Sequence, residues 1–247
     1  MRRFATAIAS LVAFLVAWKL LTLVTGTPAY ILPAPEVVGE RALRAIGSGI
    51  LWEHLWATLS EVIPGFALGA VTAVLVGVAL GKSVAIERAL SPYIVAAQAV
   101  PVLALAPLLD IWFGGGLLSR VLVVALIVFF PIAIATMVGI RTADPRLREM
   151  LRSLGATPAQ VTARLELPSA LPVIFGGLRV GVTLAVIGAV VSEWVSASTG
   201  LGVLINIADQ GLFDTPLMFV ALAALAIIGL AFYGLVVQVE RRLIQPV

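Results

Sequence analysis

The sequence has no cysteine, a single histidine and few charged residues. Only 12% of its 247 residues are charged, whereas a soluble domain carries roughly 25%. Without cysteine there can be no disulfide or thiolate ligand, and His54 has no second histidine with which to share a metal ion. With 61% hydrophobic residues, the composition favours a polytopic membrane protein. We therefore expect no metal site and no cofactor bound by this chain.

Six apolar runs are long enough to cross a hydrocarbon core of about 30 Å. Backbone groups inside lipid must be paired within their own segment, so each run is predicted to be helical. The first run exceeds the roughly 7–15 apolar residues of a signal-peptide core, so we expect it to be retained. The sequence thus predicts an all-α fold in one transmembrane domain, residues 1–247. The predicted spans are residues 4–25, 58–80, 90–113, 120–140, 174–195 and 216–239.

Basic residues gather in alternate loops between these spans. The loop between the fourth and fifth spans holds five arginines, whereas the next loop holds only two aspartates. The positive-inside rule then places both termini in the cytoplasm. Because the net charge of +3 arises from residues beside the spans, it does not indicate nucleic-acid binding. The first outer loop also contains Arg41 and Arg44, and its amphipathic residues 36–46 are expected to lie along the outer membrane surface.

A polar segment, residues 144–172, separates the fourth and fifth spans. Asp144 is a favourable helix cap and Pro145 suits the first helical turn. The helix that they start is expected to end at Gly155. Its charged residues and its apolar residues Met150, Leu151 and Leu154, together with Val161, are expected to form a docking face. The alternative is a solvated basic loop that only orients the protein.

A second short helix is predicted directly after Gly155. Thr157 and Gln160 have the spacing of a capping box. Pro168 and Pro172 are expected to break this helix before the fifth span begins. The segment would then be a helix–turn–helix on the cytoplasmic face of the membrane.

Small residues recur at every fourth position of the second span: Gly65, Gly69, Ala73, Gly77 and Gly81. This spacing places them on one helix face, where another helix backbone can approach closely. We predict a tight helix–helix contact there; the alternative is that glycine is merely common in membrane helices.

The same stretch contains an imperfect nucleotide-binding motif. Residues 77–83, GVALGKS, resemble a phosphate-binding loop but lack one residue, because that motif needs glycine where Val76 stands. The motif also follows a strand, whereas this sequence ends an apolar helix. We therefore expect no ATP site in this chain.

The polar segment resembles the coupling signature of ABC importer permeases. The matching sequences are EMLRSLGAT at residues 149–157 and LPSALP at residues 167–172, although Met150 and Leu151 replace two small residues of the family pattern. The resemblance implies a type I ABC importer permease fold, with residues 144–172 as the segment that an ATPase grips. The residues implied in coupling are Arg148, Glu149, Arg152, Gly155, Ala156, Leu167 and Pro168.

Further motifs resemble the permeases of the sulfonate, taurine and nitrate importer group. They include LPAP at residues 32–35, PVLALAPL at residues 101–108 and GLR at residues 177–179. GAVVSEWV, residues 188–195, is most similar to the branch that imports riboflavin or a pyrimidine precursor of thiamine. The resemblance implies a homodimer in the bacterial inner membrane, two ATPase subunits that bind ATP and magnesium, and a substrate-binding protein.

Polar residues within the spans are candidates for the translocation pathway, because such groups are costly in lipid. The resemblance places Ser192, Glu193 and Trp194 at the pathway wall, with Gln98 on the third span; a packing role is the alternative. Asp110 and Arg120 are expected to form a structural ion pair, and Arg179 is expected to anchor the inner interface.

Two other classes of protein fit the sequence less well. An ion-gradient-driven transporter usually shows inverted repeats and paired midplane charges, which this sequence does not display. An intramembrane hydrolase would need a nucleophile paired with a base, and no span offers a Ser–His pair. The sequence therefore favours a permease without a catalytic site.

Overall fold

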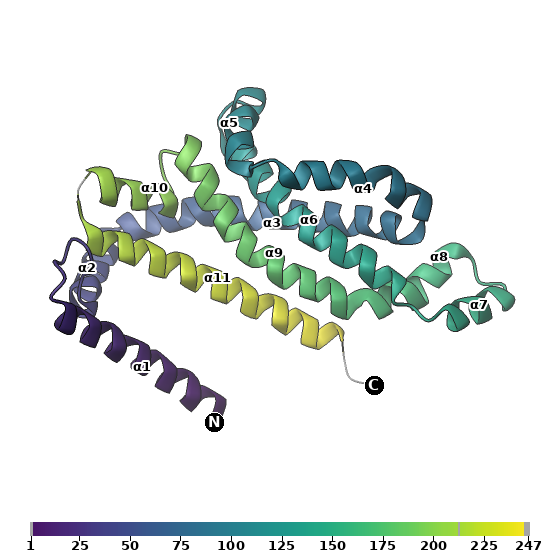
Figure 1. Ribbon diagram of the computed structural model, residues 1–247, viewed down its shortest axis with the longest axis horizontal. Coiled ribbons are helices and arrows are strands. Elements are labelled where there is room, and N and C mark those ends of the chain that lie inside the picture. The colour runs from purple at the N-terminus through teal and green to yellow at the C-terminus, as the bar shows by residue number, and fades with distance from the viewer. Residues whose placement is uncertain (1, 212, 245–247) are drawn as a thin grey trace. The chain divides into compact units, whose positions relative to one another are not determined.

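The computed structural model describes residues 2–211 and 213–244, which are almost entirely helical (Figure 1). They divide into two compact units. Unit 1 comprises Met1–Thr58 and Ser198–Ala226, and unit 2 comprises Leu59–Ala197 and Ile227–Val247. Two helices, α3 (Ile50–Lys82) and α11 (Thr215–Leu243), contribute residues to both units.

Unit 1 contains α1 (Arg2–Thr25), α2 (Pro35–Gly47), α10 (Leu201–Asn206) and η2 (Ile207–Gly211), with the first parts of α3 and α11. The helix expected over residues 36–46 is α2, which starts with a proline in its first turn. Arg41 on α2 pairs with Asp214, at 2.6 Å, just before α11.

His54 has a structural setting within unit 1. Its side chain is buried, and Nδ1 lies 2.6 Å from the carbonyl oxygen and 3.0 Å from the amide nitrogen of Gly200. The amide of Leu201 donates to the Thr58 hydroxyl at 2.8 Å. These hydrogen bonds tie the start of α3 to the loop that leads into α10.

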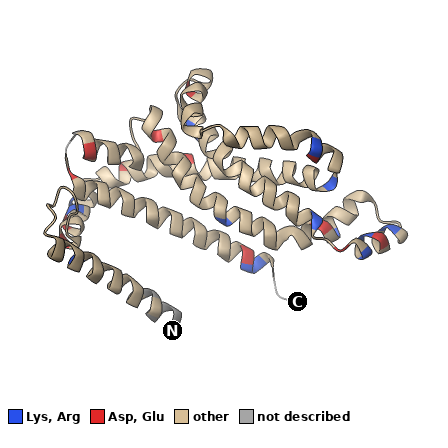
Figure 2. Cartoon of the chain, in the orientation of Figure 1, with Lys and Arg blue, Asp and Glu red and all other residues tan. Residues whose placement is uncertain are grey.

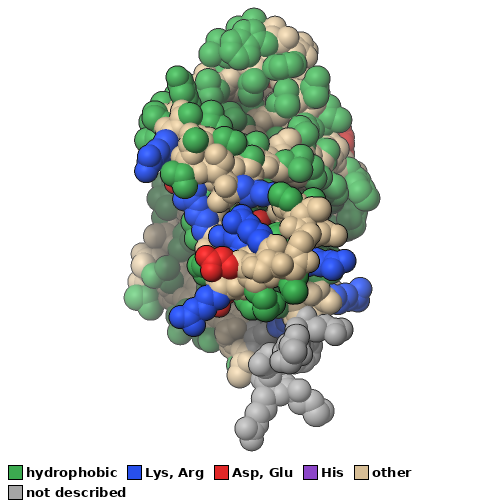
Figure 3. Space-filling view, turned by 90° about the vertical axis from the view of Figure 1, so that its right-hand side faces the viewer, with side chains coloured by type: hydrophobic (Ala, Val, Ile, Leu, Met, Phe, Trp, Pro, Cys, Tyr) green, Lys and Arg blue, Asp and Glu red, His purple; other side chains and the backbone are tan. Residues whose placement is uncertain are grey.

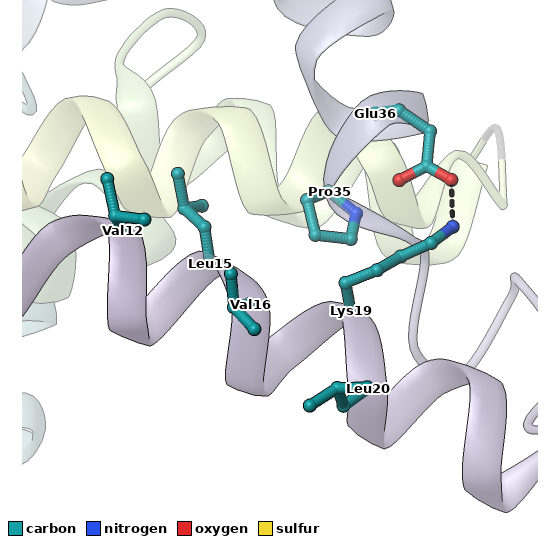
Figure 4. Close-up of a pocket in the computed structure, with 7 residues that line it drawn as sticks. All are labelled: Val12, Leu15, Val16, Lys19, Leu20, Pro35 and Glu36. Atoms are coloured by element: carbon teal, nitrogen blue, oxygen red, sulfur yellow. Dashed lines mark hydrogen bonds and ion pairs between the residues drawn. The ribbon is translucent and has the colours of Figure 1, made fainter.

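An open groove separates α1 from the start of α2 (Figure 4). Its volume is about 360 Å³, and the ion pair between Lys19 and Glu36 stands at one end. The hydrogen bond from Lys19 lowers the pKa of the Glu36 carboxyl below its ordinary value. The side chains that line the groove are Val12, Leu15, Val16, Lys19, Leu20, Pro35 and Glu36.

Unit 2 is built around α6 (Leu117–Arg141) and α9 (Leu167–Ser196), which pack side by side (Figure 1). Its other helices are α4 (Val84–Ala99), α5 (Val102–Phe113), α7 (Pro145–Ser153), α8 (Pro158–Val161) and the π-helical turn η1 (Thr162–Glu166). The remaining parts of α3 and α11 complete the unit. Small and branched apolar side chains fill the core: Val62, Ala73, Val124, Val128, Ile132, Ala133, Ala185 and Ala189.

Five helices of the described residues are long and apolar enough to cross a membrane. A sixth span exists if α4 and α5 count as one, but these helices meet at 97°. The run predicted over residues 90–113 is therefore helical on both sides of Pro101, but it is not one continuous helix. Pro101 supplies no backbone N–H and disfavours helical geometry at Val100, whose ψ of 123° is extended.

Candidate coupling site and pathway residues

The first helix of the polar segment forms as its capping residues predict. The Asp144 carboxylate accepts a hydrogen bond from the amide of Arg146 at 2.8 Å, and α7 follows over Pro145–Ser153. Gly155 has a φ of +79°, and its amide donates to the carbonyl of Arg152. A residue without a side chain suits this left-handed conformation, so the turn after α7 depends on Gly155.

The second helix starts with the expected capping box. The amide of Gln160 donates to the Thr157 hydroxyl at 3.3 Å, and the Gln160 side-chain oxygen accepts from the amide of Thr157 at 2.8 Å. Two otherwise unpaired backbone N–H groups are thereby satisfied at the start of α8. The short sequence between α7 and α8 is consequently ordered at both of its ends.

The two prolines do not break the chain of helices, which corrects the expectation from sequence. From α8 the helix continues through η1 into α9, so Pro158–Ser196 forms one uninterrupted element. In η1 the amide of Leu167 bonds to the carbonyl of Thr162, five residues back. This wider turn precedes Pro168 and gives its ring room, and the helix continues past Pro172 although Pro172 donates no backbone hydrogen bond.

Basic side chains gather at this end of unit 2 (Figure 3), where α7 contributes Arg146, Arg148 and Arg152. Of the residues assigned to coupling, Glu149, Arg152, Gly155 and Pro168 are exposed, whereas Arg148, Ala156 and Leu167 are half-buried. Leu154 has an exposed fraction of 75% and Met150 one of 51%. These two side chains are therefore free to enter a cleft of a partner. Val161 is buried, so it does not belong to the predicted docking face.

The end of α6 next to this segment is fixed by Arg141. Its guanidinium donates to the carbonyl of Leu80 at 3.0 Å and pairs with Glu87 at 2.7 Å. Figure 2 shows few charged residues along the middle of the long helices, and those of α6 are Arg120 and Arg141, near its two ends. The contacts of Arg141 join the ends of α3 and α6 to the start of α4, directly before the polar segment.

The small residues of the second span face α6. An added Cβ at Gly77 would lie 2.5 Å from Cβ of Thr136, and one at Gly69 would lie 2.6 Å from the carbonyl oxygen of Ala125. An added Cβ at Gly65 would lie 2.6 Å from Cβ of Val124, and one at Gly81 would lie 2.7 Å from Cβ of Ile140. Such distances leave no space for any side chain, so α3 and α6 approach to backbone contact.

A buried polar cluster joins three helices of unit 2. Arg120 Nη1 on α6 lies 2.9 Å from Oε1 of Glu61 on α3, and the Ser192 hydroxyl on α9 donates to Oε2 of Glu61 at 3.0 Å. Arg120 therefore pairs with Glu61, and the expected Asp110–Arg120 pair was wrong. The sequence alone did not predict this contact, because α3 and α6 are distant in the chain.

The residues assigned to the pathway fall into two environments. Ser192 and Glu193 are buried within unit 2, each with an exposed fraction of 1%, whereas Trp194 is 49% exposed. Gln98 is exposed on α4, next to the bend before α5. The structure thus brings Ser192 to Glu61, and the pathway role of all four residues stays a prediction.

Sequence reasoning missed the ion pairs of Glu61, Glu166 and Glu240. Glu166 is buried at the end of η1 and pairs with Arg148, and Arg179 pairs with Glu240. Glu61 lies four residues before Gly65, on the face that packs against α6, which was an available signal for its burial.

The long apolar helices and the capped polar projection are those of an integral membrane protein. The chain belongs to the family of binding-protein-dependent transport system inner membrane components, whose model matches residues 65–245. It is the permease subunit of an ABC importer, and its fold is that of type I importer permeases.

Similar proteins and a solved structure agree with this assignment. The riboflavin transport system permease protein RibX of Chloroflexus aurantiacus is 49% identical over 236 residues, covering 96% of this chain and 88% of that protein. The formylaminopyrimidine transport permease protein ThiX of Halalkalibacterium halodurans is 35% identical over 230 residues, covering 93% and 91%. A structure of the MetNI methionine ABC transporter matches with a TM-score of 0.70 and 21% identity, covering 79% of this chain and 97% of that one.

Proposed function

We propose that this permease imports riboflavin in an ABC transporter that contains two copies of this chain. The observation that carries the proposal is the 49% identity to a riboflavin permease over 96% of the chain. A pyrimidine precursor of thiamine is the second candidate substrate, because a formylaminopyrimidine permease is 35% identical over 93% of the chain. Two ATPase subunits and a substrate-binding protein complete the proposed complex.

The polar segment is the part of the chain that suits an ATPase partner. α7 and α8 are capped, and the first of them presents exposed Met150 and, at its end, Leu154 among basic side chains. A compact element of this kind can transmit rigid-body motion, whereas a flexible loop cannot. In the proposed cycle, ATP and magnesium bind the ATPase subunits, which draw the two coupling segments together, and the permease itself catalyses no reaction.

The orientation that this cycle requires can be tested by labelling, because the chain contains no cysteine. We expect Asp209→Cys to react with a membrane-impermeant maleimide added to intact cells. Ser153→Cys and Arg242→Cys should react only after the membrane is opened, because basic loops remain in the cytoplasm. All three positions are exposed in the structure. Labelling of Ser153→Cys from outside would place the coupling segment beyond the reach of any ATPase.

Substrate identity is tested by uptake into proteoliposomes. The chain is reconstituted with its ATPase, and uptake of labelled riboflavin and formylaminopyrimidine is measured with the binding protein and substrate outside and ATP enclosed in the vesicles. We expect ATP-dependent uptake of labelled riboflavin. Unlabelled riboflavin should inhibit this uptake by competition, and taurine should not. A matched preparation with a non-hydrolysable ATP analogue is the control. If only the pyrimidine is taken up with ATP, the pyrimidine and not riboflavin is the substrate. If neither compound is taken up, the proposal is refuted.

A further inference from the structure

Glu166 occupies an unusual place for an acidic side chain in this molecule. It is the last residue of η1, where the coupling helices join the long span α9, and its exposed fraction is only 6%. A buried carboxylate is costly unless charges or hydrogen bonds compensate it. Both of its oxygens have partners, and these partners come from different elements of unit 2.

One oxygen of Glu166 faces the first coupling helix. Nε of Arg148 on α7 lies 3.0 Å from Oε1 of Glu166, and the Arg148 side chain is 26% exposed. Because both groups are largely removed from water, their attraction is stronger than that of a surface pair. Arg148 therefore points back toward the base of α9, while its neighbour Glu149 is exposed.

The other oxygen belongs to a chain of hydrogen bonds that reaches α3. The Thr162 hydroxyl donates to Oε2 of Glu166 at 3.0 Å, and Nζ of Lys82 donates to the same hydroxyl at 2.7 Å. A hydroxyl has one proton, which it can direct to Glu166 or to the carbonyl of Pro158, 2.9 Å away. The ammonium group of Lys82 polarises the hydroxyl and so strengthens its bond to the carboxylate.

The π-helical turn makes this arrangement possible. A π-turn inserts one residue into a helix, so the residues on either side are shifted in phase by about 100°. Because of this shift, Val161, just before η1 in the chain, is buried, and Ala170, after η1, packs in the core. It also sets the direction in which Glu166 projects toward α7.

From these contacts we propose that Glu166 is a positioning residue, which locks α7 to the base of α9 so that the coupling segment and the span move as one rigid body. The inference rests on the proposed role of α7 and α8 in docking an ATPase. It assigns Arg148 to this internal ion pair rather than to a contact with the ATPase.

A charge exchange tests the proposal. In the assembled transporter, Arg148→Gln and Glu166→Gln should each lower both uptake and binding-protein-stimulated ATP hydrolysis about three- to tenfold, because each breaks one coupled pair. The exchange variant Arg148→Glu/Glu166→Arg should recover most of the loss. Basal ATP hydrolysis and assembly, measured by gel filtration, should change little. Arg88→Gln, which removes an exposed charge on α4, is the matched control.

The outcomes separate the alternatives. If Arg148 instead contacts the ATPase, Arg148→Gln will lower activity, Glu166→Gln will not, and the exchange will fail to restore it. If the single variants do not assemble and the exchange does not repair assembly, Glu166 is only a folding residue. Either result overturns the proposal.

A second variant removes the extra residue of the turn. Deletion of Ala163, whose side chain is exposed, should convert η1 to an α-helix and rotate the coupling helices by about 100° relative to α9. We expect loss of stimulated hydrolysis with the spans still inserted, whereas Ala163→Ser should be close to wild type. Normal coupling in the deletion variant would show that the phase of the turn is irrelevant.

The coupling role itself is judged separately, by the substitution Gly155→Pro in the same preparations. Normal stimulated hydrolysis both there and in Glu149→Arg would refute the proposed function of α7 and α8. If Gly155→Pro uncouples the transporter but the charge exchange restores nothing, only the positioning role of Glu166 fails.

Discussion

Replacement of Gly155 by proline is expected to abolish most of the ATP hydrolysis that the binding protein stimulates. Gly155 has a φ of +79°, whereas proline is fixed near −65° and lacks the N–H that bonds to the carbonyl of Arg152. The turn between α7 and α8 must therefore change. Because backbone strain costs about 1–3 kcal/mol, we expect a loss of about tenfold or more. Basal and stimulated hydrolysis of the reconstituted complex are compared.

Asparagine at the same position is the matched control for this prediction. Asparagine tolerates the left-handed conformation better than other side chains, and a Cβ at position 155 has open space around it. Gly155→Asn should therefore retain most of the stimulated hydrolysis. Glu149→Arg, which reverses an exposed charge on α7 without altering the turn, should also lower it. Normal uptake in both the Gly155→Pro and Glu149→Arg variants would contradict a coupling role for this segment.

Replacement of Gly77 is expected to separate α3 from α6. In Gly77→Ala the new Cβ would lie 2.5 Å from Cβ of Thr136 and 2.6 Å from the carbonyl oxygen of Ala133. Because the Ala133 oxygen is a backbone atom, the helices themselves must shift. Overpacking of this kind costs about 1–3 kcal/mol, and Gly77→Leu should cost more. The expected result is a lower melting temperature and a lower yield of the purified complex.

Gly234→Ala supplies the control for that measurement. The same methyl group is added within the long helix α11, where nothing lies within 4 Å of the new Cβ. Alanine should stabilise the helix there by up to about 1 kcal/mol, because glycine is the poorer helix former. Equal melting temperatures for Gly77→Ala, Gly77→Leu and the wild type would show that the contact between α3 and α6 is loose.

Local signals in the sequence predicted the ends of the short helices. Asp144, Gly155 and the Thr157–Gln160 capping box act over two to four residues, and the structure places each of them at the predicted helix end. Five of the six predicted apolar runs likewise lie within continuous helices, since lipid requires every backbone group to pair within its own helix. For these features the interacting atoms are neighbours in the chain.

The effect of each proline on its helix could not be predicted from the local sequence. Pro101 bends its span by 97°, whereas the helix continues through Pro168 and Pro172. A proline removes one hydrogen bond in each case, and the surrounding packing determines whether the helix axis changes. At Pro168 the preceding π-turn accommodates the ring. The sequence alone does not distinguish these outcomes, because the backbone conformation before the proline is set by the packed neighbours.

By itself, the sequence determined that this chain is a helical membrane protein with a capped polar projection, because composition and capping act locally. Only the tertiary structure determined that Glu61 pairs with Arg120, and that Glu166 joins Arg148 to Thr162. Charged side chains attract any opposite charge within reach, so sequence offers several partners for each. Helix packing selects one of them, because it brings residues from distant parts of the chain to within 3 Å and buries them there.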